Sequence, residues 1–408
     1  MSNALITTSK ITRHAVKEFI NSLQIASKVD RQLDSEFRKI GETISVRRPV
    51  MFTSSDGATL GAAEDIEEVA ASVTLDTRKH VHFAITSKDL TLSIEDFNDR
   101  YIQPAMAELA QQVESSLADS YKQIANFVGT PGTAPSTFLE VGAAAKVLTK
   151  LGTPMNVRWN AFYDEDASLA LADGLKSVFP TEIAKKAIEE AAIGRYSKFM
   201  LYENQSLKLH TVGVATGTPL INGASQSVTY AASGAAWEQT LATDGWTNST
   251  AGILLAGDVI TIAGVNSVNR RTRVSTGDLQ TFVVKSDATS GASTGPAALT
   301  ISPPMITSGP YQTVVAAPAD GAVITVKTGA GGSSHKQNIA FHENAITLVM
   351  APLDLPTQGA EASRESFNNV SIRTVTQYAI GTDTTTYRFD ILYGVKAQNP
   401  DFAVRTTS

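Results

Sequence analysis

SIEDFNDRYIQPAMAELAQQVESSLADSYKQIANF, residues 93–127, is the stretch that decides how this chain folds. Ser93 and Asp96 have the S-x-x-D spacing of a helix start, and Pro104 favours the first turn of a second, longer helix. Apolar residues then recur every three or four positions, as one helical face requires: Met106, Leu109, Val113, Leu117, Tyr121, Ile124 and Val128. A helix from Pro104 to Phe127 would be about 36 Å long. We expect a long helix that packs through a narrow stripe formed by Met106, Leu109, Val113 and Leu117.

Two further patterns precede this helix. Residues 10–40 have a helical period with charges opposite, and its apolar positions are Ile11, Ala15, Phe19, Leu23 and Ala26. Residues 43–86 alternate like strands around a polar tip, TSSDGATLGAAED at 53–65, and so predict a long hairpin. Because a lone two-stranded hairpin is marginal in water, this one needs neighbours to lie on.

Mixed elements follow the helix. NVRWNAFYDEDASLALADGL (156–175) reads as a strand and then a helix capped at Asp164 or Asp166. NIAFHENAITLVMAPL (338–353) reads as strand, turn and strand, and the tail from Val370 as a hairpin turning at 381–384.

The segment 205–336 differs in composition from both flanks. It holds 7 Lys or Arg and 6 Asp or Glu in 132 residues, about half the charge density of the rest, and 16 of the 28 glycines. Short β-type runs such as QSVTYA, GDVITIAG, QTFVVKS and AVITVKT alternate with Gly, Ser and Thr turns, a pattern typical of a small barrel or sandwich. We expect an all-β domain inserted into a mixed host that resumes after Lys336.

Composition excludes several classes. Apolar content of 42% and charged content of 18% fit a folded chain with a sizeable core. No apolar run approaches the ~18 residues of a membrane span, the N-terminus lacks the features of a secretory signal, and Cys is absent, so we expect no membrane partner and a cytoplasmic site of synthesis. A net charge of −6 argues against a strong phosphate-backbone binder.

Two motifs suggest chemistry at first sight. GASTG at 291–295 has the G-x-S-x-G spacing of a nucleophile elbow, which needs a strand before the serine and a helix after it. Pro296 and a strand-like ALTI follow instead, so a flexible loop is favoured. His80 and His82 have the spacing of a metal pair on one strand face, but no third ligand is suggested nearby, and outward imidazoles are commoner.

Four other clusters have simpler interpretations. DED at 164–166 could hold a hard cation, but acids also suit the dipole of a helix N-terminus. RRTR at 270–273 could contact nucleic acid, but it lacks interleaved aromatics, so a solvated strand or loop is favoured. GAGGSS at 329–334 is not a P-loop and reads as a linker, and His342-Glu343 lacks the second His of H-E-x-x-H. We expect no catalytic residue, no metal and no cofactor.

A long hairpin, a long helix and an N-terminal arm without chemistry suggest a subunit stabilised by its neighbours. The chain resembles the major capsid proteins of tailed double-stranded DNA bacteriophages with the Hong Kong 97-type fold. The motifs are RYIQPAMAELAQQVESSL at 100–117, NVRWNAFYDEDASLALADGL, NIAFHENAITLVMAPL and YRFDILYGVKAQNPDFAVR at 387–405, in the family's order. The inserted segment, with LINGASQ followed by LLAGDVITIAGVN, is similar to the insertion domain of the Salmonella podovirus coat subfamily.

The resemblance implies an α+β capsid fold divided by segment. The expected parts are an N-terminal arm 1–42, an extended hairpin loop 43–86, a spine helix and peripheral domain 87–133, a central domain 134–204 and 337–358, an inserted β-barrel 205–336, and C-terminal strands 359–408. It also implies a long reaching loop, matched by EQTLATDGWTNSTAG at 238–252. Glu238 and Asp244 are its candidates for pairing with a neighbouring subunit.

The expected function is therefore structural and not enzymatic. The chain would form hexamers and pentamers of an icosahedral shell around double-stranded DNA, touched only weakly and non-specifically, in a virion capsid assembled in the bacterial cytoplasm. Helical periodicity from about residue 10 leaves no room for a cleaved scaffolding segment, so a separate scaffolding protein is implied, together with a portal protein. The alternative from another class is a phage tail or host-attachment protein with a β-rich receptor domain.

Overall fold

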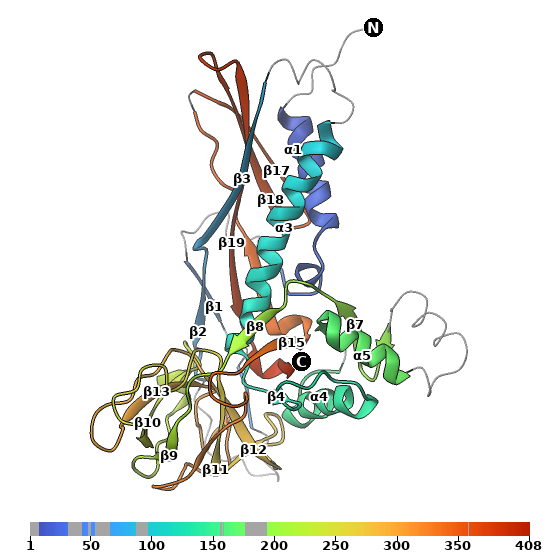
Figure 1. Ribbon diagram of the computed structural model, residues 1–408. Coiled ribbons are helices and arrows are strands. Elements are labelled where there is room, and N and C mark those ends of the chain that lie inside the picture. Colours follow the sequence, from blue (N-terminus) through green and yellow to red (C-terminus); the bar gives the residue numbers. More distant parts are fainter. Residues whose placement is uncertain are drawn as a thin grey trace, which may run out of the picture. The chain divides into compact units, whose positions relative to one another are not determined.

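The chain forms two compact units in the computed structural model (Figure 1). The described residues are 8–31, 43–47, 50–53, 66–86, 97–155, 157, 159–175, 194–357 and 359–408. The first unit combines 1–44, 73–118 and 347–396, and the second combines 45–72, 119–346 and 397–408. Both units mix helices and strands, so the α+β class is observed.

Two helices of the first unit come from the N-terminal and spine segments. The arm forms α1 (Thr8–Asn21) and the 3-10 helix η1 (Ile25–Ser27), and its five periodic apolar residues are all buried. The spine segment forms the π-helix η3 (Asn98–Ile102) and α3 (Gln103–Ala118), with Pro104 in the first turn of α3 as expected. Residues 32–40 and the predicted cap at 93–96 lie outside the described residues.

The long helix is shorter than the periodicity predicts. After α3 the chain continues as the 3-10 helix η4 (Asp119–Gln123) and then as strand β4 (Phe127–Val128), so the prediction of one helix to Phe127 is wrong. Sixteen residues span about 24 Å. The Asn126 amide donates to the carbonyl oxygen of Ala403 at 2.8 Å, and β4 pairs in parallel with β20 (Ala403–Thr407). Pairing with this strand replaces the expected last helical turn.

A five-stranded sheet completes the first unit. Its strands are β3 (Thr77–Thr86), β16 (Ile346–Met350), β17 (Glu361–Phe367), β18 (Val370–Ala379) and β19 (Thr384–Ala397). The order is β16-β19-β18-β17, with β3 also paired to β19, and the tail hairpin turns between Ala379 and Thr384 as expected. The sheet is antiparallel along the pairs of β19 with β3 and β18.

The predicted 43–86 hairpin is divided differently. Strand β1 (Thr43–Arg47) pairs with β2 (Ala70–Thr74) in a two-stranded sheet. The alternating stretch around His80 belongs to β3, and that strand pairs with β19 along ten residues instead of with the other hairpin arm. For the β3 part of the segment, the neighbour that a marginal hairpin needs is thus β19. Most of the tip, 54–65, lies outside the described residues.

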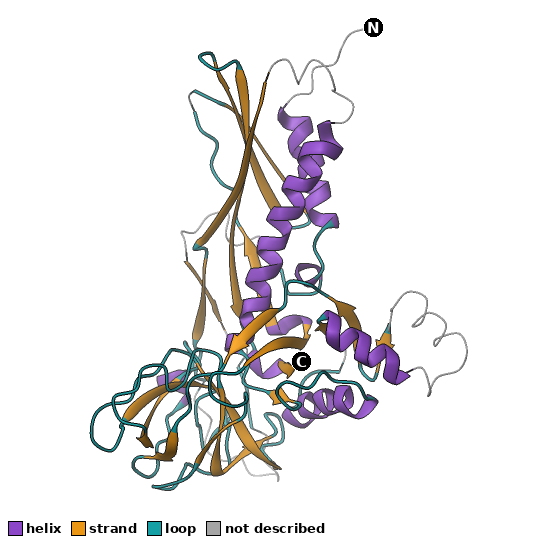
Figure 2. Cartoon of the chain, in the orientation of Figure 1, coloured by secondary structure: helices purple, strands orange, loops and turns teal. Residues whose placement is uncertain are grey.

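Helices α1 and α3 cover one face of the five-stranded sheet, where Figure 2 shows them side by side. The Thr12 hydroxyl donates to the Thr374 hydroxyl at 2.9 Å, and the hydroxyls of Ser116 and Tyr393 lie 2.8 Å apart. The stripe residues of α3 are at most 1% exposed: Met106, Leu109, Val113 and Leu117. The apolar period therefore marks the face of α3 that the unit buries.

The second unit contains a seven-stranded mixed sheet. Its order is β4-β20-β15-β5-β7-β6, with β8 also paired to β15. The strands not yet given are β5 (Trp159–Tyr163), β6 (Arg195–Tyr196), β7 (Phe199–Glu203), β8 (Lys208–Thr211) and β15 (Ser334–His342). Helices α4 (Phe138–Leu151) and α5 (Glu165–Leu175) share a core with this sheet. The Asp164 carboxylate accepts from Ala167 N, so the predicted cap of α5 is at Asp164.

A six-stranded antiparallel sheet lies within 217–326. Its order is β14-β11-β12-β13-β10-β9. The strands are β9 (Gly217–Ile221), β10 (Gln239–Trp246), β11 (Val259–Val268), β12 (Ser275–Val284), β13 (Ala297–Ser302) and β14 (Ile324–Val326). An isolated bridge joins Leu220, in the last strand of that order (β9), to Val323, which directly precedes the first strand (β14). Leu241, Ile260, Phe282 and Leu299 are fully buried in one apolar core.

Two expectations within this segment are wrong. The stretch 238–252 is not a loop, because 239–246 form β10 between β13 and β9. Its alternating Leu241 and Thr243 are buried, a period-2 signal hidden among small polar residues. QSVTYA at 226–231 is not a strand, because Tyr230–Ser233 form the short helix α7, capped by the Thr229 hydroxyl. None of the helices in the described part of the chain combines the length and the apolar content that a membrane span requires.

Candidate functional site

The motif that suggests catalysis, GASTG at 291–295, lies in a turn. Ser293 has a positive φ of 73° in the turns before β13, with no helix after it, so the elbow geometry is missing. A Cβ at the neighbouring Gly295 would lie 1.9 Å from the carbonyl oxygen of Trp246, so this turn packs closely against the end of β10. GASTG is therefore a packed turn.

The other clusters singled out from the sequence contact groups of the same chain. His80 and His82 stack at 5.5 Å on the exposed face of β3, and Lys336 pairs with Glu165 beside the α5 cap. Within the described residues no group of three metal-ligating side chains comes together. The His342 imidazole accepts from Asn344 N as the cap of the 3-10 helix η5 (Glu343–Ala345). The predicted linker at 329–334 is hydrogen-bonded to a distant segment, because Gly332 N donates to Val212 O at 3.1 Å.

One predicted cluster is partly wrong. Arg270 does not lie in solvent: its side chain is 6% exposed and forms a two-pronged pair with Asp401, at 3.1 and 3.3 Å. Its Nη1 also donates to the Thr313 carbonyl at 2.8 Å. Arginine buries well in such an arrangement because its planar fork matches a carboxylate. Arg273 reaches the carbonyl oxygens of Phe52 and Pro310 instead.

Asp258 is the centre of a buried polar junction. Its carboxylate is fully buried and accepts from His210 Nε2 at 2.9 Å, Thr328 Oγ1 at 3.0 Å, Gly213 N at 3.0 Å and Leu255 N at 2.7 Å. Burial alone would raise the pKa of Asp258, but the hydrogen bonds from His210 and the two backbone amides hold it below its ordinary value. The charged carboxylate therefore fixes the start of β11 to β8 and to the 327–328 turn.

The junction continues to Arg405 through Tyr121. The Tyr121 hydroxyl lies 3.1 Å from His210 Nδ1, and the Arg405 guanidinium lies 5.6 Å from the Tyr121 ring centre. Arg405 is fully buried and donates to the Gly257 carbonyl. Burial raises the pKa of Tyr121 to about 12 and lowers that of Arg405 to about 10, because each charged form loses water. The tyrosine hydroxyl thus stays neutral and Arg405 stays charged at neutral pH.

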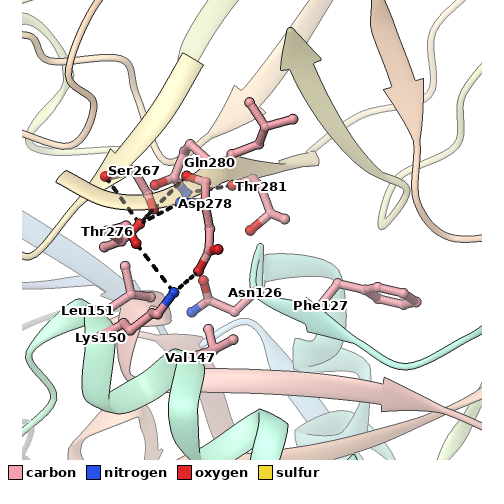
Figure 3. A pocket seen from close by; sticks show the side chains of 11 residues that line it. Asn126, Phe127, Val147, Lys150, Leu151, Ser267, Thr276, Asp278, Gln280 and Thr281 are labelled. Carbon is pink, nitrogen blue, oxygen red and sulfur yellow. Dashed lines mark hydrogen bonds and ion pairs between the residues drawn. The ribbon is translucent and has the colours of Figure 1, made fainter. Parts of the chain in front are cut away.

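A pocket lies beside this junction, between α4, β4 and the strands β11 and β12 (Figure 3). Lys150 lies at its floor, pairs with Asp278 and donates to the Thr276 carbonyl. The pocket is lined by Asn126, Phe127, Val147, Lys150, Leu151, Ser267, Thr276, Asp278, Leu279, Gln280 and Thr281. Its two charged side chains, Lys150 and Asp278, pair with each other.

Glu114 performs a separate positioning role in the first unit. It lies on α3, is 3% exposed, and accepts the backbone N–H groups of Gln24, Ile25 and Ala26 at 2.8–3.0 Å. These amides belong to the turn that leads into η1, which would otherwise hold unsatisfied donors. A charged acceptor makes such bonds roughly twice as strong as neutral ones. Glu114 therefore fixes the arm to the spine helix.

The two residues predicted to contact a neighbour occupy ordinary positions. Glu238 pairs with Lys285 of its own chain at 3.5 Å, just before β10. Asp244 lies on β10 opposite Leu220 of β9, next to an irregularity in the register. Whether either contacts a second subunit stays a prediction.

Sequence reasoning missed the buried charges. Glu114 interrupts an apolar stripe by one position, beside Val113, and this is the signal that could have found it. Asp258 stands in the Gly-Asp turn before β11, a place where aspartate often accepts local N–H groups. Arg405 lies in a short C-terminal strand, and no local pattern distinguishes it. Together these side chains connect segments of one subunit that are distant in the sequence, an arrangement that fits a structural protein.

Comparison with known proteins identifies the family. The family described as "P22 coat protein - gene protein 5" matches residues 4–405, so the chain belongs to it. The chain is thus a structural protein of bacteriophages. More particularly, it is a tailed-phage major capsid protein, which associates with itself into an icosahedral shell and is located in the virion capsid. No curated protein matches the chain.

Solved structures with similar folds are distant in sequence. One from Mycobacterium phage Che8 is 12% identical with a TM-score of 0.48, covering 94% of this chain and 90% of that chain. The capsid of Ralstonia phage GP4 is 8% identical with a TM-score of 0.46, covering 95% and 87%. The capsid of cyanophage P-SCSP1u is 10% identical with a TM-score of 0.44, covering 91% and 85%.

Proposed function

We propose that this major capsid protein is a Hong Kong 97-type subunit that carries an inserted β-barrel domain and assembles into hexamers and pentamers. The observation that carries the proposal is the family match along residues 4–405. A closed icosahedral shell built from one chain has pentamers at its vertices, and every shell larger than the smallest one also needs hexamers between them.

The proposed parts follow the expected segments. The arm (1–42), the hairpin loop (43–86) and the spine segment (87–133) precede a central domain of 134–204 and 337–358, with C-terminal strands at 359–408. The inserted barrel is 205–336. Supporting observations are the six-stranded sheet, the bridge between Leu220 and Val323, and the pairing of Lys208 on β8 with Gln337 on β15, which brings the two ends of the insertion together.

The proposed partners are those of a shell that is filled after it is built. A separate scaffolding protein would direct assembly in the bacterial cytoplasm, and a portal protein would occupy one vertex. Packaged double-stranded DNA would be touched weakly and non-specifically, which suits a chain with a net charge of −6.

Cryo-electron microscopy of the protein expressed alone, and together with the product of its scaffolding gene, tests these statements. We expect closed shells of uniform size with hexamers and pentamers when both proteins are present, and irregular or open assemblies from the coat chain alone. Uniform closed shells without scaffolding would contradict the separate scaffold. Small rings or fibres under both conditions would contradict the proposed assembly into hexamers and pentamers.

A further inference from the structure

An aromatic cluster of the segment 205–336 contacts both arms of the hairpin loop, 50–53 and 66–69. The cluster consists of four side chains that are at most 8% exposed: Tyr230, Trp237, Ile306 and Tyr311. Met51 of one arm and Val69 of the other pack against it. Met51 follows β1 in the sequence and Val69 directly precedes β2, so the contact lies next to the β1–β2 pair. Because a two-stranded sheet is marginal by itself, the cluster supports the loop where its arms begin.

The hydroxyl group of Tyr311 connects the two arms. It accepts from Met51 N at 3.1 Å and donates to the Glu67 carbonyl oxygen at 3.5 Å. A tyrosine hydroxyl is both a donor and an acceptor, so one group can bond to both arms at once. The spacing of the arms at this point is therefore set by a side chain that lies more than 240 residues further along the chain.

The orientation of the Tyr311 hydroxyl is fixed by the rings around it. The Tyr311 ring stacks on the Tyr230 ring, with the ring centres 3.5 Å apart and the planes 7° apart. Trp237 in turn meets Tyr230 edge-on, at 6.2 Å and 70°. A buried ring that is packed in this way has little freedom to change rotamer. The hydroxyl is thus directed at the hairpin arms within a single subunit.

Arg273 adds a second contact beside the first. Its Nη2 donates to the carbonyl oxygens of Phe52 at 2.9 Å and Pro310 at 3.2 Å, and Pro310 directly precedes Tyr311 in the sequence. One guanidinium group thus joins a hairpin arm to the segment that carries the tyrosine. Arg273 has a φ of 57°, which is uncommon for a residue with a long side chain. Such a conformation persists only where the surrounding structure enforces it, so the turn keeps a strained residue whose side chain bonds to the loop.

These contacts bear on the cost of assembly. A loop that is free at its root loses conformational freedom when its far end meets a partner, and this loss opposes binding. A loop whose arms are already fixed has less freedom to lose. Two side chains of the segment 205–336 therefore remove part of that cost before subunits associate.

We propose that the segment 205–336 orients the hairpin loop of its own chain for assembly, with Tyr311 and Arg273 as the positioning residues. This role rests on the proposed function in that the loop must act in shell formation. The anchoring of the arms, in contrast, is a property of the single subunit and can be measured without shells.

Hydrogen exchange of the unassembled full-length subunit tests the anchor. Tyr311→Phe keeps the stacked ring but removes the acceptor of Met51 N. We expect the peptide that contains Met51 to exchange about fivefold faster in this variant, because an amide that loses its acceptor opens more readily. The urea midpoint should stay near that of the wild type, so a role in global folding alone would not give this result.

Arg273→Asn tests the second contact in the same way. Asparagine tolerates a left-handed φ, so this variant keeps the turn and removes the donor to Phe52. We expect faster exchange in the peptide that contains Phe52. The matched control is Arg271→Asn, at an exposed position of the same turn, which should exchange like the wild type.

Assembly kinetics test the consequence. Purified subunits are mixed with scaffolding protein, and shell formation is followed by light scattering and checked by electron microscopy. Tyr311→Phe combined with Arg273→Asn should form closed shells at least about fivefold more slowly than the wild type, because the loop must then be ordered during association. Arg271→Asn should assemble at the wild-type rate.

The outcomes separate the anchor from its consequence. Unchanged exchange in both variants overturns the proposal, and so does faster exchange together with a wild-type rate of assembly. If Tyr311→Phe fails to fold, Arg273→Asn decides by the same two measurements. Wild-type subunits that form no shells with scaffolding protein would contradict the proposed function, and the exchange rates would then decide the anchor alone.

Discussion

At the scale of single residues, buried charges hold this chain together locally. Glu114, Asp258 and Asp390 are each at most 3% exposed, and each accepts several hydrogen bonds from its own chain. Burying a charge without a hydrogen-bonding partner would cost more free energy than the hydrogen bonds of a paired charge contribute. Removing one partner is therefore expected to be more harmful than any surface change.

Glu114→Ala should lower the free energy of unfolding by about 3 kcal/mol, because it leaves three N–H groups of the arm without their charged acceptor. Urea unfolding of the unassembled subunit measures the loss. The matched control is Glu108→Ala, on the exposed side of the same helix, which should change stability by less than about 0.5 kcal/mol. Equal midpoints for the two variants would contradict the anchoring role of Glu114.

His342 gives the chain a predicted pH dependence. Burial lowers the pKa of His342 below its ordinary 6.5, because the imidazolium would lose water, although Glu343 partly opposes this. The unfolded chain then binds more protons than the folded one just below pH 6.5, so this contribution to stability is present above pH 6.5 and is lost as pH falls through the folded pKa.

The measurement compares urea midpoints at several pH values between 7.5 and 5, a range set by the ordinary histidine pKa of about 6.5. His342→Asn keeps a capping acceptor for Asn344 and should show a flatter decline than the wild type. His14→Asn, at an exposed position of α1, should follow the wild type. A parallel decline in all three proteins would assign the pH dependence to other groups.

At the scale of elements, the apolar stripe on α3 is the strongest local sequence signal for a packed helix face. It is also the face where we expect a charged substitution to be most damaging. Val113 is fully buried, so Val113→Asp places an uncompensated charge in the packed face at a cost of several kcal/mol. We expect insoluble or non-assembling protein. Ala107→Asp, on the exposed side of α3, should fold and assemble. Soluble Val113→Asp protein that forms normal shells would show that the packed face is assigned wrongly.

At the scale of the whole molecule, the inserted segment should fold alone. The partners of Asp258, namely Leu255, Gly213, His210 and Thr328, all lie within 206–335, as does the apolar core around Leu241 and Phe282. At about 130 residues the fragment is near the common domain size. Excision removes Asp401, the partner of Arg270, and also Tyr121 and Arg405, but it leaves all four hydrogen-bond donors to Asp258 in place.

Backbone amide spectra of residues 206–335 check this expectation. We expect a monomer with dispersed signals, including ordered resonances for 239–246, because β10 is a central strand of the order β14-β11-β12-β13-β10-β9. Asp258→Ala should collapse the dispersion, since four hydrogen-bond donors would lose a buried anion, whereas Asp320→Ala, at an exposed turn, should preserve it. A poorly dispersed wild-type fragment would mean that the segment depends on the host.

Local sequence alone determined the apolar stripe of α3, an acidic cap of α5 at Asp164 or Asp166, the tail hairpin and the low-charge β segment, because each depends on neighbours within one turn or one hairpin. Only the tertiary structure decided the end of α3, the pairing of β3 with β19, the strand at 239–246 and the burial of Arg405 and Arg270. In these cases the partner is distant in sequence: Phe127 pairs with Arg405, and Arg270 with Asp401. Local propensity carries no information about such partners, and long-range burial and hydrogen bonding override it.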